Sequence, residues 1–213
     1  MAGLRPCGGA PAFEHPSPDL LAVAMPKKIP MSRFPIHDDL TAPEEALPVL
    51  KGLQASAAQL PNFFGVLAGS AAALRGYVRF RAELGRGALP AATRERIALA
   101  VAAHHRSQPG IALHSRTARR AGLGLDEVAS ARVWTSSDER EAALLRYLRP
   151  LAEQRGEHPA HLHEEAHEAG WSDQQLLEAI ALVSMESFTA MVNLAGEIPV
   201  DGSVEDTRVL RAA

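Results

Sequence analysis

Residues 94–124 read RERIALAVAAHHRSQPGIALHSRTARRAGLG, and this stretch decides the prediction of the fold. Apolar residues recur at helical spacing on both sides of a short turn at residues 106–108, which predicts helices over residues 91–105 and 108–121. Gly122 follows the second helix, where a helix end favours a residue that adopts a left-handed conformation. Because the connection is short, we expect the two helices to pack antiparallel to each other.

The rest of the chain after Thr41 has the same helical character. Runs of alternating β-branched residues, which would indicate strands, are absent from the sequence. Capping-box patterns support helix starts at Thr41, Ser136 and Ser172. The further helices are expected over residues 42–59, 70–84, 126–132, 138–154, 160–169 and 173–194. The sequence therefore predicts an all-α fold, a compact helical bundle.

Composition excludes several classes of partner. The chain has 213 residues and a net charge of −3, so it offers no basic surface for nucleic acid or for an anionic membrane. The longest apolar-rich stretch, residues 176–194, is interrupted by polar and charged side chains, which favours a buried helix over a membrane span. We expect no nucleic-acid partner, no membrane partner and a cytoplasmic location.

The only cysteine is Cys7, so neither an internal disulfide nor an internal two-cysteine redox couple can form. Residues 1–28 are rich in proline and glycine, and we expect a disordered or loosely attached leader there. The helical domain is expected to span residues 29–200, with a C-terminal tail over residues 201–213.

Two ionisable side chains face inward on the predicted helix pair. Glu95 shares a face with Leu99, and a buried carboxylate must be paired, hydrogen-bonded or protonated, so Glu95 is a candidate for a raised pKa. His114 lies on an apolar face with Ile111 and Ala118. Antiparallel packing would bring Glu95 and His114 together as a proton-transfer pair in an apolar pocket. The alternatives are a surface ion pair for Glu95 and a hydrogen-bonded core histidine for His114.

The turn between these helices contains Ser107, followed by Gln108-Pro109-Gly110. Ser107 stands where an N-cap is needed, and Pro109, which lacks an N–H, suits the first turn of a helix. A serine nucleophile would need a strong base, so we interpret Ser107 as a cap. Phe63 and Phe64 lie in an apolar segment, residues 60–67, expected to be a turn that forms a packing corner or the wall of a pocket.

Nine histidines raise the question of a metal site. Residues 163–167 match the H-E-x-x-H pattern of zinc proteases, but they lie among glutamates, as on a solvated helix face. A second set combines Glu95, His114 and either His104 or His105, because adjacent helical residues point about 100° apart. We expect no metal and no cofactor, and keep His105, His114 and Glu95 as the weaker metal-binding alternative.

The chain resembles the alkylhydroperoxidase D-like, or carboxymuconolactone decarboxylase, superfamily, and in particular its peroxidase-related branch. The segments that carry the resemblance are Ile29–Pro35, Leu60–Gly65, Leu74–Val78, Arg94–Ala102, His114 with Ala118–Gly122, and Phe188–Asn193. The resemblance implies an all-helical fold and assembly into a homo-oligomer, either a dimer, a trimer or a hexamer.

The resemblance also implies a chemistry. In the peroxidase members, the glutamate and histidine that match Glu95 and His114 relay protons to two cysteines, which fall at Ser107 and Gly110 in this chain. Without these thiols, thiol peroxidase activity is not expected. Decarboxylase-like members can lack the cysteines and work without a cofactor. The resemblance therefore implies acid–base chemistry by Glu95 and His114, a decarboxylation, isomerisation or elimination, on a small-molecule substrate.

Further residues are expected to line the site of this chemistry. These site-lining candidates are His104, His105, Ser107, Gly110, Phe63 and Phe64. Two other functions stay open at this point. One is a non-catalytic pseudoenzyme that serves as a binding or assembly subunit, and the other is a peroxidase-related oxidoreductase that acts without the Cys-x-x-Cys pair.

Overall fold

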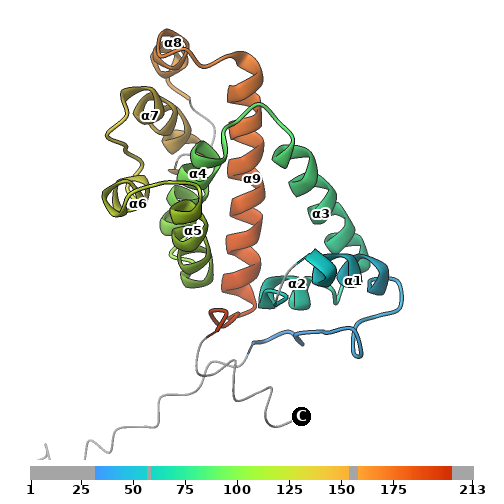
Figure 1. Cartoon of the computed structure of the whole chain (residues 1–213). Coiled ribbons are helices and arrows are strands. Elements are labelled where there is room, and N and C mark those ends of the chain that lie inside the picture. The colour runs from blue at the N-terminus through green and yellow to red at the C-terminus, as the bar shows by residue number, and fades with distance from the viewer. Residues whose placement is uncertain (1–31, 57–58, 154–157, 203–213) are drawn as a thin grey trace, which may run out of the picture.

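The computed structural model describes residues 32–56, 59–153 and 158–202. Within these ranges the chain forms α-helices and no strands, so the predicted all-α fold is confirmed (Figure 1). The helices are α1 (Leu47–Ser56), α2 (Asn62–Leu67), α3 (Ala71–Gly85), α4 (Ala91–His104), α5 (Gln108–Arg120), α6 (Leu125–Ala131), α7 (Glu139–Glu153), α8 (Ala160–Glu168) and α9 (Asp173–Ala195). The expected leader, residues 1–28, and nearly all of the expected tail lie outside the described residues.

The long helix α9 runs through the middle of the molecule, with α4–α8 on one side and α1–α3 on the other (Figure 1). It packs against α3, α4, α5 and α7. By length and composition alone, α9 could cross a membrane. Here it buries Leu176, Leu182, Met185 and Ala190 among the other helices, as the sequence predicted for this apolar stretch.

Helices α4 and α5 form the predicted antiparallel pair. Arg106 turns the chain with a left-handed φ of 56°, and Ser107 then caps α5 by accepting a hydrogen bond from the amide of Gly110. At the other end of α5, Gly122 has a φ of 94°, which allows the amide of Leu123 to reach the carbonyl of Ala118 at 3.0 Å. Both ends of α5 are thus set by local sequence, and this fixes which face it turns toward α4.

Two predicted capping boxes are wrong, and α1 also begins later than predicted. Helix α1 begins at Leu47, and Thr41 instead donates its hydroxyl to the Asp38 carboxylate in a preceding turn. Helix α7 begins at Glu139, where Asp138 rather than Ser136 accepts hydrogen bonds from first-turn amides. At the start of α7 the Asp138 carboxylate thus takes the place that was predicted for the Ser136 hydroxyl.

Elsewhere the structure adds one short helix to the prediction and confirms one predicted cap. Residues 62–67, expected as a turn, form the short helix α2 with every residue buried. Ser172 caps α9 in a complete capping box with Gln175, as predicted. The predicted helix over residues 42–59 extends onto two residues that lie outside the described ranges.

A buried ionic network fixes the rotation of α4. The Arg96 side chain is only 10% exposed, and its Nε donates to Glu127 at 2.9 Å, while Glu141 lies 3.7 Å from its Nη1. Thr93 donates its hydroxyl to Glu141 at 2.6 Å. Burial alone would raise the pKa of Glu127, but hydrogen bonds from Ser137 and its neighbours lower it to about 2. Because Arg96 is held toward α6 and α7, the preceding residue, Glu95, points toward α5.

This network predicts a large effect of one substitution. Replacing Arg96 with alanine leaves two carboxylates without their shared cation, and we expect the free energy of unfolding to fall by about 3–5 kcal/mol. The control is Arg132→Ala at the exposed C-cap of α6, which should change stability by no more than about 0.5 kcal/mol. Urea unfolding followed by circular dichroism measures both variants, and equal stabilities would contradict this role of Arg96.

Candidate active site

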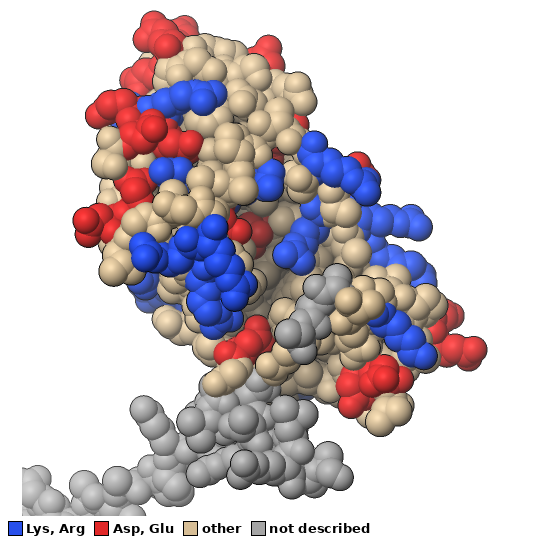
Figure 2. All heavy atoms as spheres, viewed as in Figure 1, with Lys and Arg blue, Asp and Glu red and all other residues tan. Residues whose placement is uncertain are grey.

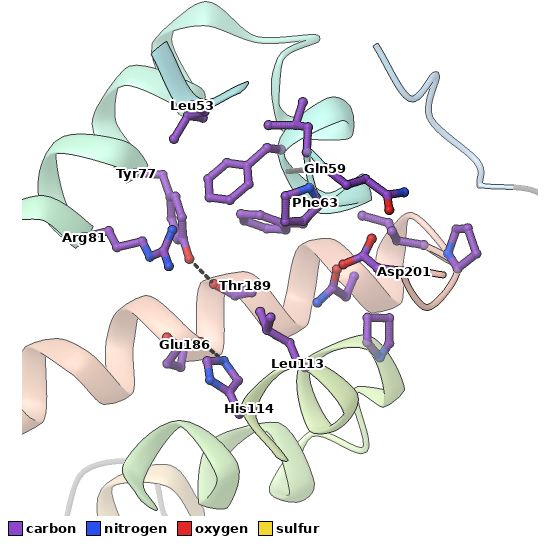
Figure 3. Close-up of a pocket in the computed structure, with 18 residues that line it drawn as sticks. Leu53, Gln59, Phe63, Tyr77, Arg81, Leu113, His114, Glu186, Thr189 and Asp201 are labelled. Atoms are coloured by element: carbon purple, nitrogen blue, oxygen red, sulfur yellow. Dashed lines mark hydrogen bonds and ion pairs between the residues drawn. The ribbon is translucent and has the colours of Figure 1, made fainter. Parts of the chain in front are cut away.

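A cavity of about 290 Å³ lies among α2, α3, α5 and α9 (Figure 3). Phe63 and Phe64 of α2 meet Tyr77 of α3 edge to face, with ring centroids 4.9–5.9 Å apart, and form an aromatic wall. Opposite them lie polar groups, among them His114 of α5 and Glu186 of α9. Figure 2 shows a hollow in this face, with acidic atoms inside it and basic side chains on its two sides.

His114 lies between two carboxyl groups that come from different helices. Its Nδ1 is 3.0 Å from Oε2 of Glu95 on α4, and its Nε2 is 3.3 Å from Oε2 of Glu186 on α9. Thr117, one turn further along α5, donates its hydroxyl to the same Glu95 oxygen at 2.5 Å. An imidazole that donates from both nitrogens is an imidazolium, so this geometry favours the protonated ring.

The electrostatics of the cluster agree with its geometry. Burial of His114 would lower its pKa, but the charge and hydrogen bond of Glu186, followed by those of Glu95, raise the pKa of His114 to about 10. The sequence predicted a raised pKa for Glu95, and this is wrong. Burial does act in that direction, but hydrogen bonds from His114 and Thr117, together with the His114 charge, lower the pKa of Glu95.

The structure brings Glu95 and His114 together as predicted, but of these two only His114 lines the cavity. The carboxyl group at the cavity wall belongs to Glu186, which the sequence reasoning missed. A signal for it was present, because Glu186, Thr189 and Asn193 stand at positions i, i+3 and i+7 and make one polar stripe on an apolar helix. In the sequence these polar residues were interpreted only as evidence against a membrane span, so they did not predict a site.

Helix α3 supplies two further cavity residues that the sequence did not reveal. Tyr77 and Arg81 are one helical turn apart, and both line the cavity (Figure 3). The hydroxyls of Tyr77 and Thr189 are hydrogen-bonded at 3.1 Å, and burial followed by the nearby Glu186 charge raises the pKa of Tyr77 to about 12. The guanidinium of Arg81 lies 5.7 Å from the centre of the Phe64 ring. The cavity thus offers a phenol and a cation as well as the histidine cluster.

Asn193 connects the cavity to the turn before α5. Its Nδ2 donates to Oγ of Ser107 at 3.3 Å, and its Oδ1 is buried without a hydrogen-bond partner in the described part of the chain. Ser107 is fully buried and does not line the cavity, so its interpretation as a cap is confirmed and its expected place in the site wall is wrong. A Cβ added to Gly110 would come within 3.0 Å of the Ala102 Cβ, so a side chain at that position requires a shift of the helix pair.

Of the other residues expected to line the site, three line the cavity and two do not. Phe63, Phe64 and Gly110 line the cavity as expected. His104 and His105 do not: His104 is exposed, with its ring 6.5 Å from Trp134, and His105 Nε2 lies 3.2 Å from the Ser187 hydroxyl. His104 is the last residue of α4 and His105 is its C-cap.

The weaker metal-binding alternative is not supported by the geometry. Across the described ranges, neither His105, His114 nor Glu95 belongs to a group of three side chains whose ligating atoms lie within 4.8 Å of one another. Both ring nitrogens of His114 already meet carboxyl oxygens at hydrogen-bonding distance. The cluster is therefore arranged to hold a proton.

The raised pKa of His114 predicts a pH dependence of stability. The folded state holds this proton up to about pH 10, whereas the unfolded chain releases it near the ordinary value of 6.5. The contribution of His114 to stability is therefore complete below about pH 6.5, and it is lost as the pH rises toward 10, by up to about 1.4 kcal/mol per pH unit. Urea unfolding of wild type and His114→Gln between about pH 6.5 and 9.5 measures it. Parallel pH profiles for the two proteins would contradict the assignment.

Comparison with known proteins finds a family model that matches part of the chain. Residues 71–154, which include Tyr77, Glu95 and His114, match the model of the carboxymuconolactone decarboxylase family. No curated protein matches the chain significantly.

Similar folds occur among solved structures. A peroxidase-related protein with an alkylhydroperoxidase AhpD core from Ralstonia eutropha JMP134 has a TM-score of 0.73 and 18% identity, over 81% of this chain and 94% of that one. A peroxidase-related protein from Silicibacter sp. TM1040 has a TM-score of 0.70 and 18% identity, over 84% and 96%. The debrominase Bmp8, as a C82A variant in complex with 2,3,4-tribromopyrrole, has a TM-score of 0.62 and 16% identity, over 79% and 91%.

At these identities the structural likeness shows the fold, and the similarity to the family model extends over residues 71–154, less than half of the chain. The matched segment covers α3 through α7, which include the helix pair α4 and α5. Residues 71–154 of this chain are thus similar to the carboxymuconolactone decarboxylase family, and the described fold is similar to that of the alkylhydroperoxidase AhpD core.

Proposed function

We propose that this protein is a cofactor-independent acid–base enzyme that acts on a small, planar, unsaturated molecule by decarboxylation, isomerisation or elimination. The observation that carries the proposal is the placement of His114 between two carboxyl groups at the wall of a largely aromatic and aliphatic cavity. The family match supports the proposal, because the family takes its name from a decarboxylase. A cytoplasmic homo-oligomer, expected from the sequence, is part of the proposal.

Glu186 is the proposed base, because its carboxyl group lines the cavity and its Oε2 is 3.3 Å from the His114 Nε2. In an isomerisation, Glu186 removes a proton from one substrate carbon and the C–H electron pair shifts into a new double bond. The same proton then returns to another atom of the substrate. In a decarboxylation, the C–C bond to the carboxylate breaks, CO₂ leaves, and the carbon that keeps the electron pair takes a proton from the His114–Glu186 pair. The pair then regains one proton from solvent water.

Glu95 acts through His114 and is a positioning residue. It meets Nδ1 of His114 and accepts a hydrogen bond from Thr117, so it fixes the ring orientation and the Nδ1 proton. Nε2 of His114 is then directed to Glu186 and the cavity. The sequence assigned proton transfer to Glu95 and His114 together, and in this proposal Glu186 takes the place of Glu95 as the carboxylate at the substrate.

The lining of the cavity supports the proposed substrate class. The rings of Phe63, Phe64 and Tyr77 offer flat apolar contact to a planar molecule. Arg81 can pair with an acidic group, and the buried Oδ1 of Asn193 can accept a hydrogen bond from a substrate donor. The debrominase Bmp8, which has the same fold, was solved with a small planar ring, 2,3,4-tribromopyrrole.

The site gives no support to thiol peroxidase chemistry. Ser107 is a buried cap whose oxygen accepts hydrogen bonds from Gly110 and Asn193, and Gly110 has no side chain. A serine has no counterpart to the sulfenic acid through which cysteine peroxidases pass. The non-catalytic alternative is left as an outcome of the experiment.

Turnover should depend on Glu186 more than on Glu95. We would incubate the protein in D₂O with small unsaturated lactone acids and β-keto acids, and follow deuterium incorporation and loss of the carboxyl group by NMR. For a substrate found in this way, we expect Glu186→Gln to lower kcat by about 10²- to 10⁴-fold, because it removes the proton acceptor. Glu95→Gln should cause a smaller loss, since the ring remains bonded to Glu186.

Glu44→Gln, an exposed carboxylate outside the cavity lining, is the matched control and should behave as wild type. Unchanged kcat in both Glu186→Gln and His114→Gln would show that the cluster does not perform the chemistry. A folded protein that turns over no member of the panel would favour the non-catalytic alternative.

A further inference from the structure

A second cluster of ionisable side chains is formed by two residues of α8 and the first residue of α9. Figure 1 shows that a short connection joins these two helices. The Nε2 atom of His167 is 3.1 Å from Nε2 of His163 and 3.0 Å from Oδ1 of Asp173. All three atoms lie within 4.8 Å of one another, and no other group of three possible ligands in the described ranges meets this condition. None of these residues lines the cavity, so the cluster is separate from the proposed catalytic site.

The local fold brings these three side chains together. His163 and His167 stand at positions i and i+4 of α8, so their rings share one face of the helix. The helix then ends in a tight turn, in which the amides of Gly170 and Trp171 bond to the carbonyls of His167 and Ala166 at 2.8 and 3.1 Å. This turn needs the positive φ of 90° at Gly170, a conformation that other residues rarely adopt.

Two buried contacts hold the turn in place. Trp171 is 1% exposed, donates its indole N–H to the Arg140 carbonyl at 2.7 Å, and is covered by the Arg140 guanidinium 4.0 Å above its ring. Ser172 then caps α9 in a capping box with Gln175. Asp173, the first residue of α9, is therefore directed back toward α8 by residues whose own positions are fixed.

The chemistry of three such atoms at one point favours a cation. Two imidazole nitrogens and a carboxylate oxygen are ligand atoms that Zn²⁺ accepts in proteins, and here they lie within 4.8 Å of one another. Zinc bound tetrahedrally at about 2.0–2.1 Å from each ligand brings ligand atoms to roughly 3.3–3.4 Å from one another. The observed separations of 3.1 and 3.0 Å are close to that arrangement.

The spacing of these residues in the chain agrees with the geometry. Residues 163–173 read HEEAHEAGWSD, which follows the zinc-binding pattern H-E-x-x-H-x-x-G-x-x-H, with aspartate in place of the third histidine. The glutamates around residues 163–167 made these residues look like a solvated helix face in the sequence, and the third ligand comes close to them only through the turn at Gly170. The side chains of His167 and Asp173 are 38% and 80% exposed, so ions in solution can reach the cluster.

We propose that His163, His167 and Asp173 bind one divalent transition-metal ion of the Zn²⁺ class. The ion joins the C-terminal end of α8 to the first residue of α9 and stabilises the turn between them. Three protein ligands leave the fourth coordination position to a water molecule or to another ligand from solution.

Isothermal titration of the full-length, EDTA-treated protein with ZnCl₂ near pH 7.5 tests the proposal. We expect one equivalent of zinc to bind at this cluster, with the affinity reduced at least tenfold in His167→Ala and in the conservative variant Asp173→Asn. The matched control is His161→Ala, which removes an exposed histidine from the same helix and should bind zinc as wild type does. Zinc should also raise the Tm of wild type and of His161→Ala, but not that of His167→Ala.

Two results would overturn the proposal. One is the absence of zinc binding by the wild-type protein. The other is undiminished affinity and stoichiometry in folded His167→Ala or Asp173→Asn, which would assign the bound ion to other histidines or to Cys7. Far-ultraviolet circular dichroism establishes that each variant is folded, and Asp173→Asn retains a side chain of nearly the same shape.

Discussion

The contact on which the rest of the site depends is the imidazolium of His114 between two carboxyl groups. Glu95 comes from α4, His114 from α5 and Glu186 from α9, so one side chain joins three helices at the wall of the cavity. Each of these groups would be unfavourable in this environment alone, because an unpaired buried charge is poorly solvated. Together they satisfy one another, and the shared protons are held where a small molecule can reach Glu186.

This cluster requires α4 to be rotated correctly, although α4 is buried on nearly all sides. Arg96 provides the constraint, because its bonds to Glu127 and its contact with Glu141 hold one side of α4 toward α6 and α7. Glu95, the adjacent residue, then points to α5. Two neighbouring residues of opposite charge thus serve two different partners, one for stability and the other for the proton cluster.

Sequence reasoning recovered the parts of the fold and site that depend on local pattern. The helix pair, its Ser107 cap and the meeting of Glu95 with His114 follow from spacing within about thirty residues. Glu186 lies 72 positions after His114, and only the packing of α9 against α5 brings the two side chains together.

The same limit applies to the second cluster and to the helix ends that were predicted wrongly. The third member of the histidine–aspartate group, Asp173, becomes visible only through the left-handed turn at Gly170. At the start of α7, Asp138 and Ser136 are both good caps, and sequence alone does not choose between neighbouring acceptors. At Ser107 and Gly110 the sequence alone was sufficient. It predicted the helix pair and its cap, and it showed that the two cysteines needed for thiol chemistry are absent from these positions.

The central claim, that His114 is held as an imidazolium by Glu95 and Glu186, is tested most directly by NMR titration of ¹⁵N-labelled histidine side chains. At about pH 8.5 we expect one imidazole still to carry protons on both nitrogens, because its pKa lies near 10 rather than at the ordinary value of 6.5. This signal should be missing in His114→Gln, and its pKa should fall in Glu186→Gln. A His114 ring that titrates near pH 6.5 in the wild-type protein would contradict the account.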